Sequence, residues 1–134
     1  LADARTGQPD LQRLHEAAAG KRVLVAEDEP VNQEVTRHLM EQAGFAVDVA
    51  DDGWLAVELA ELRAYDLILM DVQMPRLNGL DATRAIRALA AHEKTPILAM
   101  TANAFDEDRQ LCLAAGMNDH IGKPVDPQRL YELV

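Results

Sequence analysis

The sequence predicts an α/β fold in which five parallel strands alternate with five helices. Short runs of Val, Leu, Ile, Ala and Met recur along residues 21–134, and their length is typical of buried strands rather than helices. Longer segments with apolar residues at helical spacing separate these runs. Regular alternation of this kind implies a parallel sheet with right-handed crossovers and helices on both faces.

The first half of the pattern begins with an apolar strand at residues 22–26. A helix is expected at 30–43, because Pro30 suits the first turn of a helix and Gly44 suits the position after its end. The next two elements are a strand at 45–50 and a helix at 53–63.

The second half begins with a strand at 67–70, where four consecutive apolar residues lead directly into Asp71. Pro75 shortly after this run argues against a helix there. The remaining elements are expected as a helix at 80–89, a strand at 96–100, a helix at 105–115, a short strand at 120–121 and a helix from 127 onward.

Five alternating strands favour the flavodoxin-like order 2-1-3-4-5, in which the first and third strands lie side by side. The carboxyl ends of these two strands carry Glu27, Asp28 and Asp71. Thr101 and Lys123 follow the fourth and fifth strands and so reach the same edge of the sheet. The pattern therefore predicts a functional site at this edge, with Asp71 at its centre.

Carboxylates gathered at one edge repel one another unless a cation lies among them, and oxygen ligands of this type suit Mg²⁺. For the acidic residues after the first strand alone, a solvated loop is an equally good interpretation. A hydroxyl from Thr101 and an ammonium from Lys123 favour phosphoryl transfer, with Asp71 as the nucleophile that forms an acyl phosphate. Ala102 is small and would leave room for the phosphoryl group.

Composition excludes several other classes of function. The 134 residues suffice for one domain, with 1–20 as a linker or N-terminal extension. A net charge of −10 argues against direct binding of nucleic acid.

The location of the domain is expected to be the cytoplasm. The sequence has one cysteine, no signal peptide and no apolar run long enough to span a membrane, so we expect no membrane contact by this segment. This expectation is compatible with an inner-membrane anchor elsewhere in the parent protein. The start at Leu1 and the stop at Val134 indicate a piece of a longer chain.

Four motifs together resemble the receiver domain of two-component response regulators, over residues 21–134. The motifs are residues 23–32, residues 69–75 with Asn78 and Gly79 behind them, residues 100–104 and residues 116–125. The resemblance is strongest to the receivers attached to hybrid sensor histidine kinases, because of Pro30-Val31-Asn32 and the form of the motif at 116–125.

This resemblance implies that Asp71 accepts a phosphoryl group from a phosphohistidine. It also implies that Glu27, Asp28, Asp71 and the backbone carbonyl of Gln73 bind Mg²⁺. The implied partners are a histidine kinase core, expected in the same parent chain, and a histidine phosphotransfer domain.

The resemblance further implies that Thr101 and Lys123 bind the phosphoryl oxygens. Movement of Thr101 would then bias a surface made by the fourth helix, the fifth strand and the fifth helix. His120 stands where many receivers have Tyr or Phe; a switching role and a plain exposed histidine are both open, the latter slightly favoured. Gln73 and Asn103 are expected to border the path of an attacking water and to tune the lifetime of the phosphorylated state.

Three other interpretations compete with this one. A phosphatase of the haloacid dehalogenase type needs Asp-x-Asp after its first strand, which Glu27-Asp28-Glu29 does not provide. An interaction module could use the same fold without phosphorylation. A flavin site is least favoured because the first loop is acidic rather than rich in glycine and hydroxyl groups. His15, His38 and His92 are expected to be ordinary surface residues, with no role as a phosphodonor.

Overall fold

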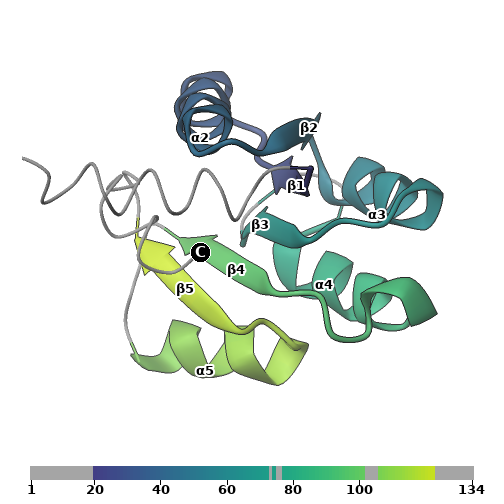
Figure 1. Ribbon diagram of the computed structural model, residues 1–134. Coiled ribbons are helices and arrows are strands. Elements are labelled where there is room, and N and C mark those ends of the chain that lie inside the picture. Colours follow the sequence, from purple (N-terminus) through teal and green to yellow (C-terminus); the bar gives the residue numbers. More distant parts are fainter. Residues whose placement is uncertain (1–19, 73, 75–76, 102–105, 123–134) are drawn as a thin grey trace, which may run out of the picture.

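A five-stranded parallel sheet in the order β2-β1-β3-β4-β5 forms the centre of the computed structural model (Figure 1). The described residues are 20–72, 74, 77–101 and 106–122. The strands are β1 (Arg22–Ala26), β2 (Ala46–Ala50), β3 (Leu67–Asp71), β4 (Ile97–Thr101) and β5 (Asp119–Gly122). This arrangement confirms the predicted flavodoxin-like order.

The described helices are α2 (Pro30–Gln42), α3 (Gly53–Leu62), α4 (Gly79–Arg87) and α5 (Asp106–Ala115). Within the described residues each expected element is present, with ends that match the expectation or differ from it by at most two residues. Asp71 is the last residue of β3 rather than the first residue after it, and a 3₁₀ turn at Ala90–His92, which the sequence did not predict, follows α4. None of the helices in these ranges combines the length and apolarity needed to span a bilayer. The proposed linker at 1–20, apart from its last residue, and the helix from 127 lie outside the described residues, so the domain boundaries stay a prediction.

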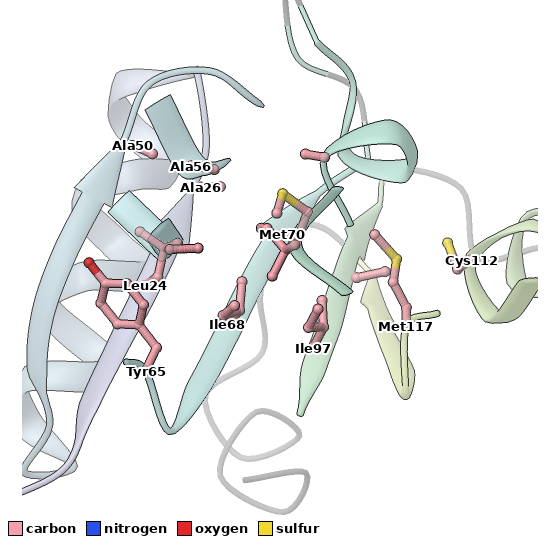
Figure 2. Close-up of a cluster of buried hydrophobic side chains, with 14 residues drawn as sticks. Leu24, Ala26, Ala50, Ala56, Tyr65, Ile68, Met70, Ile97, Cys112 and Met117 are labelled. Carbon is pink, nitrogen blue, oxygen red and sulfur yellow. The ribbon is translucent and has the colours of Figure 1, made fainter. Parts of the chain in front are cut away.

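The alternation of side chains along the strands divides the core into two clusters. Val23 and Val25 of β1 pack in a cluster with residues of α2, whereas Leu24 and Ala26 belong to a cluster that includes residues of α3, α4 and α5. Figure 1 shows α2 on one side of the sheet and the other three helices on the opposite side. Figure 2 shows the second cluster; its labelled members include Leu24, Ile68, Ile97, Cys112 and Met117. Because the central strands are buried on both faces, their near-continuous apolar sequence is explained.

Among the described residues, three helices begin at the carboxyl ends of the strands with a side-chain cap on a backbone N–H. The Glu29 carboxylate accepts a hydrogen bond from the backbone N–H of Asn32 at 2.8 Å, and the Asp52 carboxylate accepts one from the backbone N–H of Leu55 at 2.8 Å. Asn78 caps α4 by accepting from the amide of Asp81 at 2.9 Å. These caps fix where each loop ends and each helix starts.

Two glycines allow the loop between β3 and α4 to pack closely. A Cβ atom at Gly79 would overlap the backbone carbonyl of Asp71, and one at Gly53 would overlap that of Leu77. The colliding atoms are backbone atoms, so neither could rotate out of the way. The start of α4 therefore lies directly against the residue that ends β3.

The expectation that His92 is a surface residue is wrong, because its side chain is completely buried. Its Nε2 lies 3.0 Å from the carbonyl oxygens of both Ala60 and Arg63. Carbonyls only accept, so Nε2 carries a proton, and Nδ1 lies 3.0 Å from the hydroxyl of Thr95, which donates to it when the ring is neutral. The imidazole thus binds carbonyls at the end of α3, where helix carbonyls lack partners within the helix. His38 is exposed, as expected, and His15 lies outside the described residues.

Replacement of His92 by alanine is expected to lower the free energy of unfolding by about 3 kcal/mol, because it leaves a cavity and removes the donor to two carbonyls. The measurement is urea denaturation followed by circular dichroism. His38→Ala, an exposed position on α2, is the matched control and should change stability by less than about 0.5 kcal/mol. Equal effects of the two substitutions would contradict the buried role of His92.

Gly79→Ala is expected to cost about 3 kcal/mol of stability, because the added methyl group collides with backbone that must move. Gly20→Ala provides a contrast: its φ of 79° is unfavourable for alanine, but the added Cβ meets nothing within 4 Å. That variant should lose only about 1 kcal/mol. The same denaturation experiment compares them, and a loss at Gly79 no greater than at Gly20 would refute the packing argument.

Candidate active site

The pairing of β1 with β3 brings two carboxylates to the same edge and face of the sheet. Ala26 of β1 pairs with Met70 of β3. The next residue after each of them is Glu27 and Asp71, so these two residues lie at equivalent positions. Strand alternation gives Asp71 the same phase as Leu69, which lies in the cluster that α2 covers. Glu27 has the same phase as Val25, which lies in that cluster too, so alternation places both acidic side chains on the face that α2 covers.

Glu27, Asp28 and Asp71 form a compact carboxylate cluster. One carboxylate oxygen from each residue lies within 4.8 Å of the other two. Glu27 is fully buried and Asp71 is 3% exposed, whereas Asp28 is exposed to solvent. The structure therefore brings together three of the residues that the sequence predicted as metal ligands.

This cluster fits a hard divalent cation. Carboxylates held this close repel one another when ionised, and burial of two of them increases the cost of their charge. A cation on the exposed side, next to Asp28, would relieve the repulsion. Oxygen-only ligands with one side open to water match the coordination that Mg²⁺ prefers.

Hydrogen bonds hold the loop that carries the first two carboxylates. The backbone N–H of Glu27 donates to the carbonyl of Ala50 in β2 at 3.0 Å. The Glu27 carboxylate accepts at Oε2 from the backbone N–H of Glu29 at 3.1 Å. This second bond orients the buried carboxylate from within its own loop.

Hydrogen bonds also fix the backbone that follows Asp71. Val72, the next residue, donates its N–H to Met100 of β4 at 3.0 Å and accepts from the N–H of Gly79 at 2.9 Å. Together with the close approach of Gly79, these bonds hold Asp71 between β4 and the start of α4. Its carboxylate is presented by backbone with little freedom to shift.

Thr101 was predicted to act at the same edge, whereas for His120 the sequence left both a switching role and a plain exposed histidine open. Thr101 is the last residue of β4 and pairs with Gly122 of β5, one position beyond the pair formed by Asp71 and Met100. The backbone of Thr101 therefore reaches the predicted edge. His120 pairs with Ala99 within β5. Their side chains lie outside the described part of the chain, as do the predicted site residues Gln73, Ala102, Asn103 and Lys123.

Gln33 is a site residue that the sequence analysis did not single out. Its side-chain amide donates to the carbonyl of Glu27 and to a carboxylate oxygen of Asp51. The only signal in the sequence was a polar side chain in the first turn of the helix after the acidic loop. Such residues are common at helix starts, so the pattern alone could not identify it.

Comparison with known proteins gives concordant results. The family model of the response regulator receiver domain matches residues 23–134. Hybrid signal transduction histidine kinase I of Dictyostelium discoideum is 41% identical over 121 residues, which are 85% of this chain and 7% of that protein. The chain thus spans only a small part of this relative.

Two solved structures that contain receiver domains are also similar to this chain. The receiver domain of sensor histidine kinase PA1611 from Pseudomonas aeruginosa PAO1, solved with a magnesium ion in its active site cleft, is 45% identical, with a TM-score of 0.80 over 86% of this chain and 94% of that chain. The complex of the Saccharomyces cerevisiae histidine phosphotransfer protein Ypd1 with the receiver domain of Ssk1 gives 27% identity and a TM-score of 0.77, over 85% of this chain and 86% of that chain.

The four sequence motifs, the parallel order 2-1-3-4-5 and the carboxylates at the ends of β1 and β3 all agree with these matches. With the family model matching residues 23–134, the chain belongs to the response regulator receiver domain family.

Proposed function

We propose that this receiver domain accepts a phosphoryl group on Asp71 in a Mg²⁺-dependent reaction. The observation that supports this most strongly is the cluster of Glu27, Asp28 and Asp71, whose carboxylate oxygens lie within 4.8 Å of one another. The magnesium bound by the similar Pseudomonas receiver adds support for the choice of metal. Glu27, Asp28, Asp71 and the backbone carbonyl of Gln73 would hold the ion.

In the proposed reaction the Asp71 carboxylate attacks the phosphorus of a phosphohistidine. The new bond joins an Asp71 oxygen to phosphorus while the phosphorus–nitrogen bond breaks, and the imidazole nitrogen keeps the electron pair of that bond. Mg²⁺, when bound, neutralises charge on the phosphoryl oxygens. Thr101 donates a hydrogen bond to these oxygens and Lys123 supplies a positive charge beside them.

Switching would follow from the position of Thr101 at the end of β4. When the Thr101 hydroxyl is drawn toward the phosphoryl group on Asp71, the packing next to β5 changes. His120 belongs to β5 and pairs with Ala99 of β4. The change in packing biases the surface made by α5, β5 and the helix expected from residue 127. Gln73 and Asn103 keep their proposed role of tuning the lifetime of the acyl phosphate.

The wider context that we propose is a hybrid sensor histidine kinase in a phosphorelay. Its support is the similarity to a hybrid histidine kinase and to a receiver solved with a histidine phosphotransfer protein. The phosphodonor would be a histidine kinase core in the same parent chain, and the next partner would be a histidine phosphotransfer domain. The proposed location of this domain is the cytoplasm, whether or not the parent protein has an inner-membrane anchor.

Asp71→Ala is expected to abolish phosphorylation, because it removes the only proposed nucleophile. The protein is incubated with Mg²⁺ and acetyl phosphate, and the added phosphoryl group is located by mass spectrometry of intact protein and peptides. Undiminished label in the variant would refute Asp71 as the acceptor. Failure of the wild type to accept any label would instead favour an interaction module that uses this fold without phosphorylation.

The matched control is Asp66→Asn, at the opposite end of the same strand segment. Asp66 is exposed and accepts a hydrogen bond from the backbone N–H of Arg22 at 2.9 Å, which an asparagine oxygen can also accept. This variant should be labelled to the wild-type extent. Repeated turnover of a small phosphate ester by the wild type would point to a phosphatase, because a receiver retains one phosphoryl group per molecule.

Removal of a proposed metal ligand is expected to weaken Mg²⁺ binding by about tenfold or more, a loss of about 1.4 kcal/mol. The variants are Glu27→Gln and Asp28→Asn, measured by isothermal titration calorimetry. Trp54, which is 54% exposed and lies at the start of α3, offers a fluorescence signal as a second measurement. Glu34→Gln, an exposed acidic position on α2, should bind Mg²⁺ as the wild type does; an equal loss in this control would show a diffuse charge effect rather than a site.

A further inference from the structure

The side chain of Gln33 connects the loops that follow β1 and β2. Its Nε2 donates to the backbone carbonyl of Glu27 at 2.8 Å and to Oδ1 of Asp51 at 2.8 Å. Gln33 lies in the first turn of α2, where its backbone N–H donates to the carbonyl of Glu29 at 2.9 Å. One residue therefore contacts the acidic loop through both its backbone and its side chain.

The partners fix the orientation of the Gln33 amide. The carbonyl of Glu27 and the carboxylate of Asp51 can only accept hydrogen bonds, so the nitrogen of the amide faces both of them. A primary amide nitrogen has two hydrogens, and each has one partner here. The amide meets two oxygen acceptors without adding a charge that would compete with a bound cation.

These contacts hold the backbone of Glu27 on both sides. Its N–H donates to Ala50 and its carbonyl accepts from Gln33. That carbonyl belongs to the planar peptide unit that continues to Asp28, so its direction determines where the chain places the next Cα atom. Asp28 is itself exposed, which leaves this peptide, rather than packing, to set the position of its carboxylate.

We propose that Gln33 is a positioning residue that holds the carboxylates of Glu27 and Asp28 in the geometry required for Mg²⁺. The inference rests on the proposed function of this cluster as a magnesium site. Gln33 acts through the backbone of Glu27 and does not touch the ion. Loss of its donors allows the Glu27–Asp28 peptide to rotate, so that the cluster must be reordered each time Mg²⁺ binds.

The test is Gln33→Met, which keeps the length of the side chain but removes both donors. The dissociation constant for Mg²⁺ is expected to rise about fivefold, which corresponds to roughly 1 kcal/mol for the lost hydrogen bonding. Isothermal titration calorimetry measures it under conditions where circular dichroism shows the variant to be folded. Gln42→Met, the same change at an exposed position at the other end of α2, is the matched control and should bind as the wild type does.

Gln33→Glu is the second variant. Its dissociation constant for Mg²⁺ tests the same proposal if Gln33→Met does not fold. The ionised glutamate has a similar size but no hydrogen to donate. Weaker Mg²⁺ binding despite its added negative charge would support positioning by the donors. Binding as tight as or tighter than that of the wild type would overturn it.

The remaining outcomes separate this inference from the proposed function. Wild-type affinity in a folded but less stable Gln33→Met protein would show that Gln33 only joins two loops, and would overturn the positioning role alone. An equal loss of affinity in Gln42→Met would also overturn it. A wild-type protein that does not bind Mg²⁺ at millimolar concentration would overturn both the proposed site and the role of Gln33.

Discussion

Parallel pairing of β1 with β3 is the interaction on which the site depends. Both strands are buried on their two faces, so a slip of one residue would turn apolar side chains of both clusters to the wrong face of the sheet. The core therefore enforces the register that brings Glu27 level with Asp71. Two carboxylates that would separate in a free chain are held together because the apolar strands behind them cannot shift.

The two edges of the sheet use polar groups in opposite ways. At the amino edge, donors and acceptors are matched: the guanidinium of Arg87 donates to the carbonyls of Gly116, His92 and Thr95 and to the side chain of Asn118. Burial lowers the pKa of Arg87 from its usual value. At the carboxyl edge, three acidic residues gather, two of them buried and the third, Asp28, exposed to solvent. The first arrangement stabilises the fold, whereas the second suits a cation and a phosphoryl group.

Much of this organisation could be predicted because it depends on local patterns. The strand predicted at 22–26, with four apolar residues after Arg22, has the observed bounds of β1, and the parallel alternation placed Glu27, Asp28 and Asp71 at one edge. The burial of His92 was missed because a lone histidine in a short segment between a helix and a strand has no periodic context that marks it as buried. Its partner Ala60 is 32 residues away, beyond the reach of any local pattern. The proposed roles of Thr101 and Lys123 stay predictions.

The sequence by itself determined the order and kind of the elements and the oxygen-rich chemistry at the ends of the strands. It could do so because strand periodicity, helix caps and turn residues act between near neighbours in the chain. Only the tertiary structure decided which polar groups meet, such as Gln33 with Asp51 or Arg87 with Asn118. These contacts join separate elements, and their geometry depends on how each helix packs against the sheet, which no local rule specifies.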